Sequence, residues 1–118
     1  PASGAGAGAV AAAATRVGVP YEWGGAPPGV GFDCSGLVMW AYGQVGISLP
    51  HSSSAQFAAG FQVPMSDLQP GDLVFYSDPS VHVAIYVGGG SIIEAPTFGQ
   101  TVHVIPMYSQ FVQAVRIA

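Results

Sequence analysis

A single cysteine is the first residue in this sequence that could do chemistry. Cys34 stands in the run GFDCSGL at residues 31–37 and is the only cysteine among 118 residues. A lone free cysteine is most often a small buried hydrophobic residue. Asp33, however, is a good helix N-cap, which predicts Cys34 in the first turn of a helix, where free backbone N–H groups and the helix dipole favour a thiolate. Two interpretations of Cys34 follow, an inert thiol and a nucleophile.

A nucleophilic cysteine would also need a cationic partner. Lowering the pKa of a thiol from about 8.5 to about 4 requires about 6 kcal/mol, whereas a helix terminus stabilises the thiolate by only about 0.3–1 kcal/mol. The chain offers three histidines. His103 lies in TVHVI, where strand alternation places it opposite its valine neighbours, so we expect a solvent-facing residue without a catalytic role. His51 lies in the Ser-rich segment LPHSSS, where it either lines a groove or is simply exposed. His82 opens the strongly apolar segment HVAIYV and is the best candidate for the partner.

The segment after His82 supplies a carboxylate. If residues 88–90 (GGG) form a hairpin loop, Val87 pairs with Ser91, and Glu94 becomes the diagonal same-face neighbour of His82. Glu94 would then accept a hydrogen bond from one ring nitrogen and leave the other for the thiol, as in nucleophile, base and orienter arrangements. The alternative is that Glu94 points to solvent on the outer face of the sheet. A register shift of one residue would break the pairing.

These residues must be positioned by helices in the first half of the chain and strands in the second. Residues 1–8 (PASGAGAG) are typical of a flexible linker end, and residues 9–118 of one domain. We expect helices at about 7–17, 33–46 and 53–59, with an irregular Gly- and Pro-rich segment at 21–33. Strands are expected at 73–77, 82–87, 91–95, 101–105 and 112–117. Helices followed by short strands predict an α+β fold with an antiparallel sheet.

One helix face should be buried. Cys34, Val38, Ala41 and Val45 recur at helical spacing and form one apolar stripe. Cys34 therefore lies at the inward edge of the first turn.

Composition excludes several classes of function. Six carboxylates face only two cationic side chains, both arginines, for a net charge of −4. Nucleic-acid binding needs a basic surface, which this chain lacks. No apolar run approaches the roughly 20 residues of a membrane span. The histidines, cysteine and carboxylates do not show metal-ligand spacing, and the GGG segment joins two strands rather than a strand and a helix, so neither a metal nor a phosphate-binding cofactor is expected.

At this point the sequence resembles a known family. The runs PYEWGG (20–25), GFDCSGLV (31–38), LQPGDLVFY (68–76) and HVAIYVGGGSIIEAP (82–96) are similar to the NlpC/p60 cysteine peptidases, in the family's order, over about residues 18–117. Within this family, the chain looks closer to the Rip-type wall hydrolases of mycobacteria and their actinobacterial relatives than to members with a different third residue. The resemblance implies a papain-like fold, in which N-terminal helices pack on a small antiparallel sheet.

The resemblance also implies roles for individual residues. Cys34 would be the nucleophile, His82 the base and Glu94 the third polar residue of the triad. Many family members carry histidine at the third position, so Glu94 is a departure. A carboxylate holds an imidazolium more strongly than a neutral histidine does, and we expect it to tune the activity rather than abolish it.

Three further residues match substrate-binding positions of the family. Tyr21 would line the site and assist the oxyanion, or it is a packed aromatic with its hydroxyl at the surface. Asp33 and Ser35 would border the pocket for the D-glutamyl side of the substrate. For Asp33, a purely structural role as a helix cap is an equal alternative.

The substrate class implied by the resemblance is the stem peptide of peptidoglycan, cut between D-γ-glutamate and meso-diaminopimelate. The expected protein is a secreted or envelope-exposed monomer without a cofactor, and a recruiting or inhibitory segment outside this sequence is possible. Two alternatives stay open: a non-catalytic wall-binding module on the same scaffold, and an amidase or acyltransferase that acts on another amide.

Overall fold

The structure, a computed structural model, describes residues 4–21, 33–76, 82–97, 99–108 and 111–117. Its α-helices are α1 (Gly4–Ala14), α2 (Cys34–Gly43) and α3 (Ser53–Ala59), and a 3₁₀ turn spans Met65–Asp67. Its strands are β1 (Phe61–Val63), β2 (Leu73–Tyr76), β3 (His82–Gly88), β4 (Ser91–Glu94), β5 (His103–Pro106) and β6 (Phe111–Arg116). None of the helices described is long and apolar enough to cross a membrane.

Helix α1 begins earlier than the sequence indicated. Gly4–Gly8, expected in a flexible linker, form the first turns of the helix. The small residues there are explained by packing: a Cβ on Gly71 would lie 2.4 Å from the Cα of Gly6, and a Cβ on Gly8 would lie 2.6 Å from a methyl group of Val45. The glycines let α1 approach its neighbours closely.

Helix α2 begins at the expected residue. Its stripe is confirmed, because Val38 and Ala41 are fully buried and Cys34 and Val45 pack against the same core. The helix ends at Gly43, three residues before the expected end, and a turn follows to Gly46, whose φ of 83° favours glycine. Helix α3 has the predicted bounds, and Ser52 caps it by accepting a hydrogen bond from the backbone N–H of Ala55.

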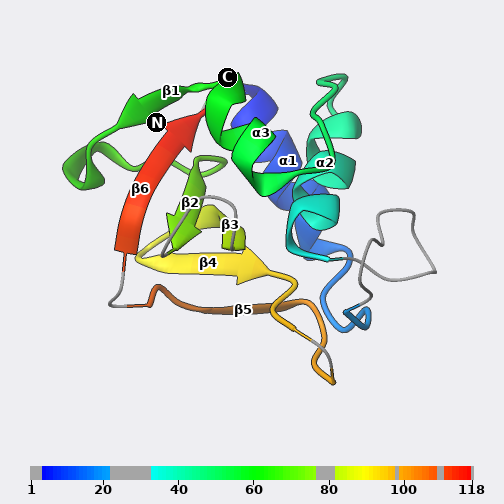
Figure 1. Cartoon of the computed structure of the whole chain (residues 1–118). Coiled ribbons are helices and arrows are strands. Elements are labelled where there is room, and N and C mark those ends of the chain that lie inside the picture. The colour runs from blue at the N-terminus through cyan, green and yellow to red at the C-terminus, as the bar shows by residue number, and fades with distance from the viewer. Residues whose placement is uncertain (1–3, 22–32, 77–81, 98, 109–110, 118) are drawn as a thin grey trace.

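The described strands form one six-stranded antiparallel sheet in the order β1-β6-β2-β3-β4-β5. The α+β prediction is confirmed. Four of the five predicted strands appear as β2, β3, β4 and β6, and their ends differ from the predicted ends by at most one residue. Strand β1 was not expected, because three residues are too few for a period-2 pattern. The helices gather on one side of the sheet (Figure 1).

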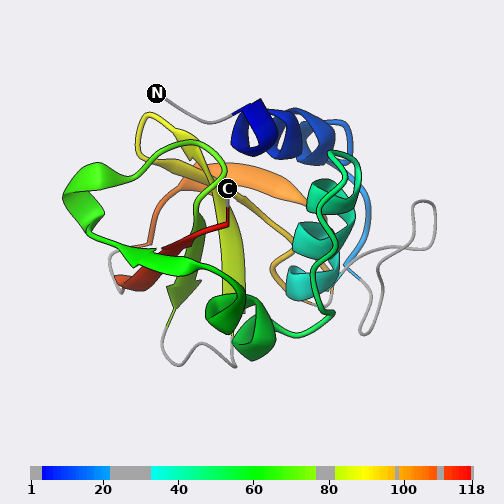
Figure 2. The same cartoon turned by 90° about the horizontal axis from the view of Figure 1, so that it is seen from above.

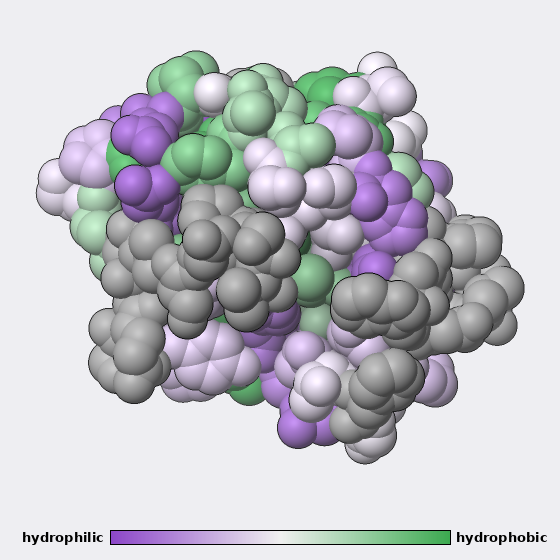
Figure 3. Space-filling model, in the orientation of Figure 1, coloured by the Kyte–Doolittle hydropathy of each residue, from purple (hydrophilic) through white to green (hydrophobic). Residues whose placement is uncertain are grey.

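The sheet carries an apolar cluster on each face. On the helix side, Leu73, Phe75, Val83 and Ile85 pack with α1 and α2, which lie beside each other in the view from above (Figure 2). On the other face, a smaller cluster is built from residues of β2, β3 and β4, namely Val74, Tyr76, Ala84 and Ile92. The surface seen in Figure 3 mixes hydrophilic and hydrophobic residues, in keeping with a chain that is only 7% charged.

Candidate active site

Cys34 is the first residue of α2. Asp33 precedes it as the N-cap, and the Asp33 Oδ1 accepts a hydrogen bond from the Gly36 N–H at 2.7 Å. This local geometry follows from the sequence, because a short carboxylate before the first turn satisfies one of the free N–H groups of the helix. The Cys34 side chain is half-buried, so it is accessible from a pocket while it rests on the core. The expectation that Asp33 caps the helix is confirmed.

His82 is the first residue of β3, and it lies against Cys34 on one side and Glu94 on the other. Its Nε2 is 2.7 Å from the Glu94 Oε1, and its side chain lines the same pocket as Cys34. The side chain is 17% exposed. Burial lowers the pKa of His82, but its interaction with Cys34 and with the Glu94 carboxylate outweighs burial and raises the pKa to about 9. The imidazole is therefore held protonated at neutral pH.

The pairing of His82 with Glu94 depends on the β3–β4 hairpin. Ile85 faces Ile93, which is the register that the sequence predicted. The turn itself differs, because Gly88 belongs to β3 and pairs with Ser91, and the register shifts between Tyr86 and Gly88. This bulge absorbs one residue and restores the predicted register beyond it. The expected diagonal contact between the two side chains is confirmed.

Glu94 is completely buried, and its carboxylate accepts three hydrogen bonds. Oε1 accepts from His82, while Oε2 accepts from the His103 Nε2 at 2.7 Å and from the Tyr108 hydroxyl. Burial would raise the pKa of Glu94, but the hydrogen bonds from His82, Tyr108 and His103 outweigh it, so the pKa is lowered. Glu94 is thus an anion inside the protein, and the alternative that it points to solvent is wrong.

The expectation for His103 is also wrong. The residue was assigned to the solvent-facing side of its strand, but the β4–β5 register sets it directly opposite Glu94, and its side chain points to that carboxylate. Val104 is instead the outward residue, at 49% exposed. Alternation along a strand says which residues share a face, but not which face is covered. Tyr108, the other donor, was not anticipated, because it follows β5 in a segment without strand or helix periodicity.

A pocket of about 300 Å³ opens beside the thiol. Its walls include five of the six predicted site residues, Tyr21, Asp33, Cys34, Ser35 and His82, as well as His51, Ser52, Ser53, Ser54 and Pro96. The sixth, Glu94, does not line this pocket but holds His82. Of the quoted motifs, residues 22–32 lie outside the described part of the chain.

The pocket residues have distinct local environments. Burial, and then the charges of Cys34 and Asp33, raise the pKa of Tyr21, so its hydroxyl stays protonated next to the thiol. The His51 Nε2 lies 2.8 Å from the Asp33 Oδ1, so His51 lines the pocket wall rather than standing free in solvent. Ser35 is buried, and its carbonyl accepts a hydrogen bond from the Gln56 side chain at 2.9 Å.

Gln56 was missed in the sequence, although it ties the pocket together. The side chain is completely buried, and its Nε2 donates to the carbonyls of Ser35 and Pro50 at 2.9 and 2.8 Å. It therefore joins the first turn of α2 to the segment that carries His51. Its position on the inward face of a seven-residue helix is the only signal that the sequence offers for it.

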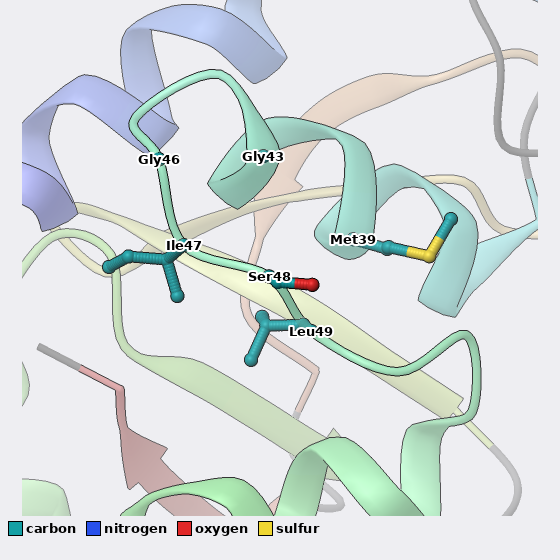
Figure 4. A pocket seen from close by; sticks show the side chains of 6 residues that line it. All are labelled: Met39, Gly43, Gly46, Ile47, Ser48 and Leu49. Atoms are coloured by element: carbon teal, nitrogen blue, oxygen red, sulfur yellow. The ribbon is translucent and has the colours of Figure 1, made fainter.

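A second pocket lies elsewhere and has no chemistry of this kind. About 370 Å³ in volume, it lies between α2 and the segment after it, and it is lined by Met39, Gly43, Gly46, Ile47, Ser48 and Leu49 (Figure 4). None of these side chains titrates near neutral pH. Across the described residues, no group of three or more His, Cys, Asp and Glu side chains is arranged to hold a metal ion. The thiol pocket is therefore the candidate active site.

A thiol, an imidazole and a buried carboxylate in contact have a specific chemical capacity. An imidazolium held by an anion stabilises a neighbouring thiolate, which is the reactive form of cysteine. The same imidazolium can protonate a leaving group. The arrangement is suited to acyl transfer through a thioester.

Comparison with known proteins finds a family and several similar chains. The profile of the NlpC/P60 family matches residues 18–117. A protein of Mycobacterium tuberculosis named probable endopeptidase Rv2190c is 60% identical over 101 residues, which cover 85% of this chain and 26% of that protein. Peptidoglycan endopeptidase RipA of the same organism is 44% identical over 106 residues, covering 79% of this chain and 22% of RipA. The chain thus spans about a quarter of the length of these relatives.

Solved structures share the fold. The structure of the peptidoglycan hydrolase RipB from Mycobacterium tuberculosis superposes with a TM-score of 0.88 at 36% identity, covering 96% of this chain and 64% of that one. Structures of RipA include forms mutated at a cysteine, a histidine and a glutamate, with TM-scores of 0.88, 0.88 and 0.89 and 37% identity in each case. The likeness extends over nearly the whole chain.

Proposed function

Because the chain belongs to the NlpC/P60 family, we propose that it is a peptidoglycan hydrolase, a cysteine endopeptidase that cuts stem peptides between D-γ-glutamate and meso-diaminopimelate. The observation that carries the proposal is that His82 lines the same pocket as Cys34 and is held at 2.7 Å by the buried carboxylate of Glu94. A structural cysteine would not need a charged histidine beside it, nor a buried anion behind that histidine.

The relatives support the residue assignment. RipA has been studied as forms mutated at a cysteine, a histidine and a glutamate, in that order along its chain. That histidine and that glutamate are 12 residues apart, as are His82 and Glu94. The names of RipA and RipB, an endopeptidase and a hydrolase of peptidoglycan, support the substrate class.

In the proposed reaction, the Cys34 thiolate attacks the γ-glutamyl carbonyl carbon, and the carbonyl oxygen becomes an oxyanion. The backbone N–H of Cys34, at the start of α2, and the protonated Tyr21 hydroxyl can stabilise that charge. His82 then donates its proton to the leaving amine, the C–N bond breaks, and a thioester on Cys34 remains. Glu94 keeps the imidazolium oriented during both events.

Water completes the cycle. Neutral His82 takes a proton from a water molecule, the resulting hydroxide adds to the thioester, and the C–S bond breaks to release the γ-glutamyl carboxylate. The proton taken from water leaves His82 as an imidazolium, and breaking of the C–S bond leaves Cys34 as a thiolate, so both groups are in their starting state. Every step uses side chains of this chain, and we propose no cofactor.

Substrate binding is assigned to the walls of the pocket. Asp33 and Ser35 border the thiol at the start of α2 and are proposed to contact the D-glutamyl side of the stem peptide. Since peptidoglycan lies outside the cytoplasm, the proposed location is the cell wall or the secreted fraction, and the proposed active form is a monomer.

Digestion of purified muropeptides, followed by mass analysis, tests this function. The wild-type chain should release fragments with a new amine on the diamino acid and a new carboxylate on D-glutamate. Cys34→Ala should release none, while its circular dichroism spectrum and melting temperature stay those of the wild type. Release of the intact stem from the sugar would indicate an amidase instead. Binding without any cleavage by the wild type would indicate a wall-binding module and refute the enzyme assignment.

A further inference from the structure

The second oxygen of the Glu94 carboxylate is occupied by groups outside the substrate pocket. Oε2 accepts hydrogen bonds from His103 on β5 and from Tyr108 just after it, whereas Oε1 accepts from His82. Glu94 has no exposed surface, so protein groups must satisfy both oxygens. The orientation of the carboxylate is consequently fixed by His103 on β5 and by Tyr108 after it.

We propose that His103 is a positioning residue of this active site: with Tyr108, it holds Oε2 of Glu94 so that Oε1 stays aligned with Nε2 of His82. The inference rests on the proposed function, since it concerns the same thiolate and imidazolium. His103 does not line the thiol pocket. Its effect on Cys34 would therefore be transmitted through Glu94 and His82.

The need for such a residue follows from the flexibility of glutamate. A glutamate side chain has several rotamers, and holding one of them costs up to about 2 kcal/mol of conformational entropy. One hydrogen bond from His82 leaves the carboxylate free to rotate about its last bond and exchange its oxygens. Two donors on Oε2 remove that freedom. The Glu94↔His103 backbone pairing sets the distance between the two residues.

The anchor itself is well held. His103 is directly preceded by Val102, whose backbone N–H donates to the Val19 carbonyl at 2.8 Å, and Tyr21 donates from its N–H to the Gln100 carbonyl at 2.9 Å. The start of β5 is therefore tied to the segment that ends in a pocket residue. His103 donates from Nε2, so the proton is on that nitrogen, and its side chain is 31% exposed.

Tyr108 supports the same oxygen as a permanent donor. Burial, the hydrogen bond to Glu94 and the charge of Glu94 raise the pKa of Tyr108, so its hydroxyl keeps its proton throughout the working range. The Tyr108 ring packs edge-on against Tyr76 at 5.0 Å between centroids, and Tyr76 in turn lies 6.1 Å from the His82 ring. Among the described residues, the titratable side chains around the carboxylate are His82, His103, Tyr108 and Tyr76.

The test compares His103→Ala with His103→Gln, because a glutamine amide can supply the Nε2 donor without the imidazole. Val104→Ala is the matched control, since Val104 is the next residue on the same strand and points outward. Two rates are measured for each protein: alkylation of Cys34 by iodoacetamide at about pH 6, where an ordinary thiol is almost fully protonated, and turnover of a stem peptide.

We expect His103→Ala to lower the alkylation rate and kcat about tenfold, with KM nearly unchanged, because a hydrogen bond to a charged group is lost and the pocket is not altered. His103→Gln should recover most of both rates, and Val104→Ala should match the wild type. Tyr108→Phe, which keeps the ring and removes the other donor, should also lower the rates.

Wild-type rates in His103→Ala would overturn the inference. So would equal losses in the alanine and glutamine variants at equal melting temperatures, because the donor would then not matter. Failure of the proposed function looks different. Rapid wild-type alkylation without stem-peptide cleavage would refute the substrate while the alkylation rates still decide the role of His103. A wild-type thiol that is as slow as free cysteine would refute both.

Discussion

Replacing Glu94 with glutamine should move the alkaline limit of activity to lower pH. His82 must be protonated to stabilise the thiolate and to donate to the leaving amine. Its pKa is raised to about 9, so the wild-type kcat/KM should be level through neutral pH and fall as the pH rises through about 9. Glu94→Gln removes a charge that lies 2.7 Å from Nε2 of His82 while nearly preserving side-chain volume.

The magnitude follows from the contact. The rise from 6.5 to about 9 corresponds to a net stabilisation of the imidazolium by about 3 kcal/mol. A hydrogen bond to a charged group is worth about 1.5–3 kcal/mol, so losing the charge should lower the pKa of His82 by roughly 1–2 units. At about pH 8.5 the protonated fraction, and with it kcat/KM, should then fall by roughly 3- to 25-fold relative to wild type.

The assay is the pH dependence of kcat/KM on a stem peptide. Asp67→Asn is the matched control, because it changes the net charge equally but removes an exposed carboxylate, 58% accessible, that pairs with Arg116 and not with His82. Its alkaline limit should equal that of the wild type. An alkaline limit near pH 9 in Glu94→Gln would show that Glu94 does not hold the His82 proton, and the reasoning would fail.

Three predictions concern stability, each measured by urea unfolding. Gly71→Ala should lower the free energy of unfolding by several kcal/mol, because φ is 99° and the new Cβ would lie 2.4 Å from the α1 backbone. Gly89→Ala is its control: φ is 63° but the space around it is open, so the loss should be about 1 kcal/mol. Gln56→Leu should cost about 2–4 kcal/mol, because two buried carbonyls lose their donor, and an unchanged midpoint would contradict this. Arg116→Ala should cost about 3–5 kcal/mol by removing the two 2.9 Å hydrogen bonds that Arg116 donates to the buried Asp72 carboxylate; a loss below about 1 kcal/mol would refute that role.

The parts of the site that were predicted correctly depend on short-range features. Asp33 before an apolar stripe placed Cys34 at a helix start, and a cap is decided within four residues. The hairpin between β3 and β4 placed Glu94 near His82, because a short glycine loop restricts the possible registers. Even there, the bulge at the turn could not be foreseen, although it left the distal register intact.

The errors concern contacts between segments joined by longer connections. Strands β4 and β5 are linked by an irregular segment, so no turn type sets their register, and His103 was assigned to the wrong side. The pairing of β1 with β6 joins residues about fifty positions apart, and three residues carry too little pattern to predict a strand. The glycines of α1 indicated flexibility in the sequence, whereas in the fold they permit close packing.

The amino-acid sequence by itself identified the thiol, the imidazole and the carboxylate, and local features placed Cys34 at a helix start and Glu94 beside His82. That Cys34 and His82 share one pocket depends on the packing of α2 against β3. Only the tertiary structure decided how that carboxylate is held, since His103, Tyr108 and the complete burial of Glu94 arise from the packing of β5 against β4. The physical reason is that the free energy of a long-range strand pairing depends on all the side chains that it buries. These side chains come from distant segments, so no short stretch of sequence determines the pairing.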